Sequence, residues 1–146
     1  MDFLFVGFPE KQDLIVIITD SKIFLTTSGV YMIKKMLVGK IHRAVITGCD
    51  LNYPGSITID KILMDAAQIH AWEQVQVVNL NNGVRFETYA ISGEAEKGEI
   101  LLNGAASRLA IPGDKVIIMS FGWLTQEEIL NLNPRIIHVD DNNKIV

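Results

Sequence analysis

The chain has 146 residues, of which 49% are hydrophobic and 21% charged, and its formal net charge at pH 7 is −4. This length predicts a single domain that can bury a core without help from metals or disulfides. The acidic balance, with no basic run longer than Lys34-Lys35, argues against a nucleic acid as partner.

Residues 1–31 resemble neither a signal peptide nor a membrane anchor. Asp2 stands where a signal peptide carries positive charge, and the apolar run 14–18 is far too short to cross a bilayer. A second methionine, Met32, opens the patterned part of the chain. We therefore expect residues 1–31 to be an N-terminal extension outside the core, consistent with a misplaced start codon, and residues 32–146 to form one domain without membrane association.

Short strands separated by turn signals follow Met32. Strands are expected at 44–47, 56–59, 74–80, 84–91, 100–102 and 115–121. Asn81-Asn82-Gly83 predicts a hairpin, and Pro112-Gly113-Asp114 predicts a turn.

Two helices are predicted among these strands. Asp60 is a suitable N-cap for a helix over 61–69. Thr125 and Glu128 have capping-box spacing, so a short helix should begin there and end before Pro134. Many short strands, few helices and no internal repeat favour a mainly β fold, a closed β-barrel with small helical insertions.

Cys49 is the only cysteine, so one chain can form neither an internal disulfide nor a cysteine-based zinc cluster. With no adjacent histidine, Cys49 is expected to be a small buried or half-buried thiol. This cysteine usage fits a reducing cytoplasm.

Tyr53-Pro54-Gly55-Ser56 is the first motif with distinctive chemistry. A serine hydroxyl can attack the preceding carbonyl and shift the chain from amide to ester, and Gly55 helps because it has no Cβ and tolerates positive φ. Loss of the Ser56 α-proton then expels the ester, and the dehydroalanine formed hydrolyses to a pyruvoyl group and ammonia. Taken alone, the motif is far more typical of an ordinary turn that enters a strand, and only the other motifs favour the chemical interpretation.

Lys40 and His42 would share one face of a strand, either as a cationic wall suited to a carboxylate or as a solvated face. In the strand after the hairpin, alternation places Arg85 and Tyr89 on one face and Thr88 on the other. If all three serve one site, a bulge, a strand end or a neighbouring subunit must intervene.

The small residues Asn103-Gly104-Ala105-Ala106 predict a turn that could begin a helical turn. Its backbone N–H groups could approach and hold an anion, although a plain turn is the simpler interpretation of this motif alone.

In order and spacing these motifs resemble the pyruvoyl-dependent aspartate 1-decarboxylase family. The likeness runs from Met32 to about Phe121. It comprises Met36-Leu37-x-Gly39-Lys40-x-His42-Arg43, Asp50-Leu51-x-Tyr53-x-Gly55-Ser56, Asp65-Ala66-Ala67, Asn82-Gly83-x-Arg85-Phe86-x-Thr88-Tyr89-Ala90-Ile91, Asn103-Gly104-Ala105-Ala106 and Gly113-Asp114-x-Val116-Ile117-Ile118. Pro54 departs from the family, which carries an acidic residue there, and this puts the speed of processing in doubt.

The resemblance implies a double-psi β-barrel that cleaves itself between Gly55 and Ser56, with Ser56 becoming a covalent pyruvoyl cofactor. Thr88 would help hold the oxyanion during processing, and Tyr89 would donate a proton in catalysis. The substrate-binding residues that the resemblance implies are Lys40, His42, Tyr53, Arg85, Asn103, Gly104, Ala105 and Ala106.

The implied reaction is the conversion of L-aspartate to β-alanine and CO2 for pantothenate biosynthesis in the cytoplasm, through a Schiff base to the pyruvoyl group and without a metal. The implied assembly is a homotetramer with active sites between subunits, which agrees with the apolar composition. A maturation factor, which some members need, is a further implied partner.

Two alternatives to this function come from the residues themselves. A non-catalytic small β-barrel could bind a small anion and keep its backbone intact. A different enzyme could use Lys40 as the Schiff-base amine, and then Ser56→Ala would leave the activity untouched.

Overall fold

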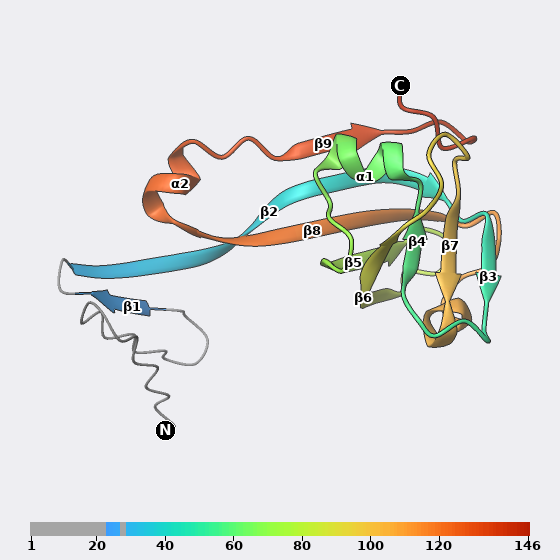
Figure 1. The fold of residues 1–146 in the computed structure, drawn as a ribbon, viewed down its shortest axis with the longest axis horizontal. Coiled ribbons are helices and arrows are strands. Elements are labelled where there is room, and N and C mark those ends of the chain that lie inside the picture. The colour runs from blue at the N-terminus through green and yellow to red at the C-terminus, as the bar shows by residue number, and fades with distance from the viewer. Residues whose placement is uncertain (1–22, 27–28) are drawn as a thin grey trace. The chain divides into compact units, whose positions relative to one another are not determined.

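The computed structural model describes residues 23–26 and 29–146, which form a mainly β fold with three short helical segments (Figure 1). In chain order the elements are β1 (Ile23–Thr26), β2 (Gly29–Val45), β3 (Gly48–Asp50), β4 (Ile57–Ile59), α1 (Lys61–Ala67), β5 (Gln74–Asn79), β6 (Arg85–Ser92), β7 (Ile100–Asn103), the 3₁₀ helix η1 (Gly104–Arg108), β8 (Lys115–Thr125), α2 (Gln126–Leu130) and β9 (Arg135–His138). The prediction of a mainly β chain with small helical insertions is confirmed, and the architecture fits a small β-barrel.

The strands are hydrogen-bonded in the order β1-β2-β8-β5-β6-β4-β7-β3, with β9 beside β2. The predicted hairpin is present, because β5 and β6 pair antiparallel with Gln74 opposite Tyr89. β4 joins two distant segments: it pairs in parallel with β6, Ile57 opposite Ala90, and antiparallel with β7, Ile57 opposite Leu102. The chain that leads into β4 therefore enters between β6 and β7.

The chain divides into two units. One comprises Met1–Met36 and Gly122–Asn133, and its described part includes β1, which pairs antiparallel with the start of β2. The other comprises Leu37–Phe121 and Pro134–Val146 and contains the hydrophobic core. Most of the predicted extension lies outside the described residues, so its separation from the core stays a prediction.

The core of the second unit is made by aliphatic side chains that alternate along the strands and line one face of α1. Fully buried members are Ile41, Ile46, Ile57, Ile59, Leu63, Val75, Val77, Ile100, Leu102, Val116 and Ile118. Each such side chain stabilises the fold by about 1.5–3 kcal/mol relative to an exposed one. Because Ile57 and Ile59 belong to this set, β4 is a rigid support for the residues immediately before it.

Several predicted boundaries are wrong, and the start of β2 is wrong by the largest margin. The strand expected at 44–47 is the end of the much longer β2, and Ile46 and Thr47 leave the ladder because their N–H groups donate to Asp114 and Ile100. α1 ends at Ala67 because Gln68 takes a left-handed φ of 55°. The capping box of α2, between Thr125 and Glu128, is confirmed.

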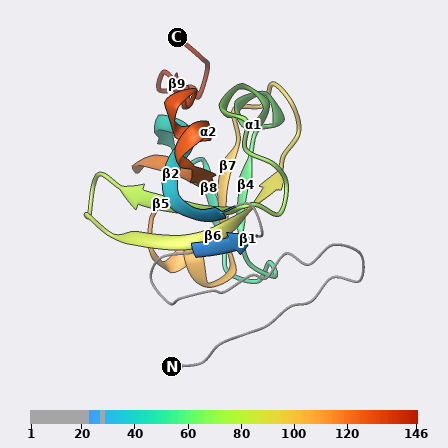
Figure 2. The same cartoon turned by 90° about the vertical axis from the view of Figure 1, so that its left-hand side faces the viewer.

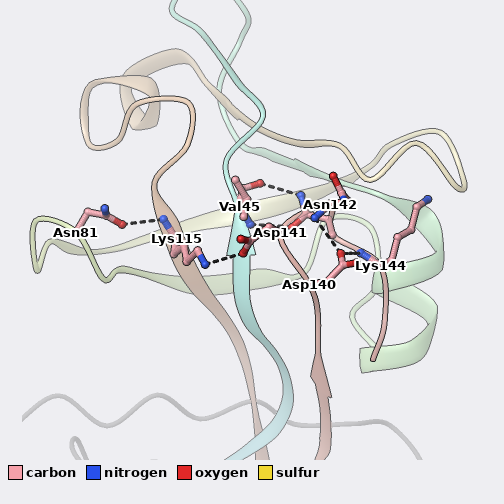
Figure 3. Close-up of polar contacts among 8 residues, drawn as sticks. Val45, Asn81, Lys115, Asp140, Asp141, Asn142 and Lys144 are labelled. Carbon is pink, nitrogen blue, oxygen red and sulfur yellow. Dashed lines mark hydrogen bonds and ion pairs between the residues drawn. The ribbon is translucent and has the colours of Figure 1, made fainter.

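The C-terminal residues after β9 are tied to the end of β2 (Figure 3). Buried Asn143 accepts a hydrogen bond from the Val45 N–H at 2.7 Å and donates one to the Val45 carbonyl at 2.8 Å, although the two residues are 98 positions apart. Lys115 at the start of β8 pairs with Asp141 at 2.6 Å. α1 packs against β9 in the same unit (Figure 2). These contacts make the last residues part of the barrel unit.

The expectation for Cys49 is wrong. Its side chain is exposed, because β3 carries it on an outer face, and its thiol contacts the carbonyl oxygen of Ala110 at 3.5 Å. Partial desolvation, followed by the charge of Asp114, raises the pKa of this thiol. Within the part of the chain that the structure describes, no helix is both long and apolar enough to cross a membrane.

Candidate active site

Ser56 stands immediately before β4 in an unusual backbone conformation. Its φ is +93° and that of Gly55 is +94°, so two successive residues lie in the region that favours glycine. For a residue with a Cβ this costs on the order of 1–2 kcal/mol. Ser56 is also only 2% exposed. A buried serine held under backbone strain after a glycine is the strongest sign of chemistry in the described residues.

Asn103, at the end of β7, holds Ser56 by both backbone and side chain. Its N–H donates to the Ser56 carbonyl at 2.9 Å. Its Nδ2 donates to the Ser56 hydroxyl at 3.3 Å and to the Thr58 hydroxyl at 2.9 Å. Asn103 is itself 3% exposed, so one buried amide orients the hydroxyl of Ser56.

Gly104 begins η1 and lies directly against the segment that contains Gly55. A Cβ on Gly104 would be 2.8 Å from the Gly55 Cα, 2.9 Å from the Gly55 nitrogen and 3.0 Å from the Tyr53 carbonyl oxygen. The residues predicted to form a small turn are therefore the start of a 3₁₀ helix that packs, backbone against backbone, on the Gly55 segment. Only a residue without a side chain permits this contact.

Tyr89 reaches the same segment from β6. Its hydroxyl lies 3.4 Å from the Pro54 carbonyl oxygen, and a Cβ on Gly55 would be 3.8 Å from the Tyr89 oxygen. The Gly55 N–H closes a tight turn by donating to the Tyr53 carbonyl at 2.7 Å. Tyr53 itself is exposed.

The alternation expected on β6 is consistent with its pairing. Arg85 is exposed, and its Nη1 donates to the Gln76 side chain at 3.0 Å on the face that also carries Tyr89. Thr88 lies opposite Val75. If the parallel β4–β6 register is continued back from Ile57, the Gly55–Ser56 pair runs alongside Thr88 and Tyr89. Arg85, Thr88 and Tyr89 all lie within β6, so how the three could serve one site stays a prediction.

Lys40 and His42 lie on β2, where they pair with Ile136 and His138 of β9. The His42 ring packs edge-on against His138 with ring centres 5.0 Å apart. The pKa of His42 is lowered, mainly by partial burial and then by the charges of Lys40, His138 and Arg43. Three strands separate β2 from β4 in the sheet order, so a cationic wall formed by Lys40 and His42 at Ser56 stays a prediction.

The lowered pKa of His42 predicts that acid destabilises the fold. An unfolded chain, whose histidines have pKa values near 6.5, binds the proton more readily than the folded chain does. The contribution of His42 to the free energy of unfolding should be fully present above pH 6.5. It should be lost as the pH falls towards the pKa of His42 in the folded chain. Urea unfolding at pH 7.5 and 5.5 checks this. His42→Gln should reduce the fall, whereas the exposed control His70→Gln should not. An equal fall in both variants would contradict the assignment.

Two neighbours of the site were not predicted from the sequence. Thr58 shares the Asn103 amide with Ser56, and the spacing of these two hydroxyl residues along a strand was an available signal. Trp72 stacks on Tyr89 with ring centres 5.7 Å apart and an 18° angle between the rings. Nothing local in the sequence points to that contact. Among the described residues, no group of three or more His, Cys, Asp or Glu side chains could hold a metal ion.

Comparison with known proteins adds evidence of a different kind. A family model described as aspartate decarboxylase matches residues 32–146. The aspartate 1-decarboxylase of Caldicellulosiruptor bescii is 60% identical over 115 residues, which cover 79% of this chain and 90% of that protein. The aspartate 1-decarboxylase 1 of Gloeobacter violaceus is 55% identical over 79% of this chain and 98% of its own length. The aspartate 1-decarboxylase of Bacillus cereus strain B4264 is 55% identical over 115 residues, which cover 79% of this chain and 91% of that protein.

Proposed function

The chain belongs to the aspartate decarboxylase family, and from this membership we propose that it converts L-aspartate to β-alanine and CO2 for pantothenate biosynthesis. Identity of 55–60% over nearly the whole length of named aspartate 1-decarboxylases supports the reaction. The structural observation that carries it is the buried, strained Ser56 behind Gly55.

The geometry supports self-processing at this position. The Ser56 hydroxyl oxygen attacks the Gly55 carbonyl carbon, the C–N bond breaks, and the proton passes to the released amine. Loss of the Ser56 α-proton then expels the Gly55 carboxylate, and water converts the dehydroalanine into a pyruvoyl group and ammonia. Cleavage releases the positive φ of Ser56, the residue of the pair that carries a Cβ, and this favours the reaction. Thr88, which the β4–β6 register brings alongside, is the proposed donor to the oxyanion.

The residues around Ser56 fit a pyruvoyl group made from it. Gly104 lets its backbone pack directly against the Gly55 segment, and the Asn103 amide is a donor beside the Ser56 side chain. Once formed, the group supplies a ketone that condenses with an amine and a conjugated carbonyl that accepts the electron pair released with CO2. Tyr89 is the proposed proton donor, since its hydroxyl already lies against this segment.

Substrate binding is assigned to charged and polar neighbours. Arg85 donates one hydrogen bond to the Gln76 side chain, and its other guanidinium N–H groups are suited to a carboxylate. Lys40 is the second proposed carboxylate partner, with His42 nearby. Tyr53 and the segment from Asn103 through Gly104 and Ala105 to Ala106 complete the proposed pocket.

The remaining parts of the proposal concern the assembled protein. Residues 32–146 are the proposed decarboxylase domain, and residues 1–31 the proposed extension. L-Aspartate is the proposed substrate. A homotetramer, a maturation factor and a cytoplasmic location stay predictions from the family resemblance.

Intact-mass measurement combined with a product assay tests the function. The full chain should mature into fragments 1–55 and 56–146, the second with a ketone at its N-terminus that reacts with a hydrazine probe. The matured protein should form β-alanine from L-aspartate. A folded chain that stays intact on prolonged incubation with a family maturation factor, and forms no β-alanine, would contradict the proposal and favour the non-catalytic anion-binding alternative.

A further inference from the structure

Trp72 occupies a turn position that is poorly suited to tryptophan. In the turn from His70 to Glu73, the Glu73 N–H donates to the His70 carbonyl at 3.2 Å, and Trp72 is the third residue with a φ of +72°. A positive φ at the third position is the requirement of a type II turn, which glycine or asparagine normally meets. A bulky residue there strains the backbone.

Hydrogen bonds hold this turn in place against β6. The Trp72 N–H donates to the Ala90 carbonyl at 2.8 Å, and the Ala90 N–H donates to the Glu73 carbonyl at 2.9 Å. The His70 N–H donates to the Glu73 carboxylate at 2.8 Å. The backbone therefore needs no contribution from the indole to keep its conformation.

The indole also contributes little to the core, because Trp72 is 75% exposed. Its aromatic contact is the stacked Tyr89 ring, 5.7 Å away between centres and inclined by 18°. The Tyr89 hydroxyl in turn lies 3.4 Å from the Pro54 carbonyl oxygen, beside the Gly55–Ser56 bond. A strained, exposed tryptophan thus stacks on Tyr89, the residue proposed to donate the proton in catalysis.

We propose that Trp72 is a positioning residue for Tyr89. The indole face restricts rotation of the Tyr89 ring and holds its hydroxyl at the Pro54–Ser56 segment. The inference rests on the proposed function, in which Tyr89 donates the proton. Because Trp72 acts through Tyr89, it should affect kcat more than KM.

Trp72→Gly in the full chain separates this role from a structural one. Glycine suits the positive φ, and this offsets its greater entropy in the unfolded chain, so the unfolding temperature should stay close to that of the wild type and maturation should be complete. Loss of the stacked pair should lower kcat for L-aspartate roughly threefold to tenfold and leave KM within about twofold. Trp72→Phe, which keeps a flat ring, should recover most of kcat. In a Tyr89→Phe background, Trp72→Gly should lower the residual kcat by less than about twofold.

Each other outcome overturns the inference. Full kcat in Trp72→Gly, with an active wild type, would reject the positioning role and leave the proposed function standing. A lower unfolding temperature or incomplete maturation of Trp72→Gly would assign the indole a structural role, as would a Trp72→Phe variant that recovers no kcat. A mature wild-type protein that forms no β-alanine would reject the proposed function itself, and this inference with it.

Discussion

Ser56→Ala is expected to leave the chain uncleaved and to abolish decarboxylation. Alanine lacks the oxygen that attacks the Gly55 carbonyl, and without cleavage no pyruvoyl group can form. The fold should persist, because the change removes only a 3.3 Å hydrogen bond from Asn103 and keeps the Cβ that the site already accommodates. Intact mass should therefore show one chain, and β-alanine formation from L-aspartate should fall to background.

Ser92→Ala is the matched control, since Ser92 is an exposed serine whose hydroxyl donates to the neighbouring Gly93 carbonyl. That variant should mature and react like the wild type. Wild-type β-alanine formation by Ser56→Ala would refute the role of Ser56 and support the alternative in which Lys40 is the reacting amine.

Gly104→Ala is expected to slow cleavage between Gly55 and Ser56 by about 100-fold, because its Cβ would displace the backbone that must be aimed for attack. The new methyl group would lie 2.8 Å from the Gly55 Cα and 2.9 Å from its nitrogen, and neither atom belongs to a side chain that could rotate away. Overpacking should also destabilise the fold by about 1–3 kcal/mol. The fraction of cleaved chain followed over time by intact mass, together with urea unfolding, measures both effects.

Gly83→Ala separates the close contact from backbone strain. Gly83 has a φ of +75°, comparable to +58° at Gly104, but a Cβ there would meet nothing within 4 Å. This control should lose about 1 kcal/mol of stability and still cleave at the wild-type rate. Equal slowing in both variants would show that strain, rather than contact with Gly55, limits processing.

Local patterns predicted the parts of this protein that depend on neighbours in the chain. The Thr125 capping box and the hairpin at Asn82-Gly83 were correct because each is formed by residues a few positions apart. The alternation of Arg85 and Tyr89 against Thr88 followed from the period of a strand. The Gly55-Ser56 motif predicted a site of chemistry only together with the other family motifs, since alone it is typical of an ordinary turn.

Boundaries and burial were less predictable. β2 extends from Gly29 to Val45 and so begins well before the strand predicted at 44–47. Pairing partners, rather than residue propensity, determine where a strand begins and ends. Cys49 is exposed although cysteines are usually buried, because its face of β3 is left uncovered. Such outcomes depend on packing against elements that no local window contains.

The sequence by itself predicted which residues carry the chemistry and, through the family motifs, pointed to the family and its reaction. Only the tertiary structure decided how Ser56 is held. Asn103, 47 positions away, orients its hydroxyl, and Gly104 packs on Gly55. Trp72 meets Tyr89 for a similar reason, since the turn before β5 is bonded to β6. The contacts at Ser56 arise from the pairing of β4 with both β6 and β7, and long-range strand pairing leaves no periodic signal in the sequence.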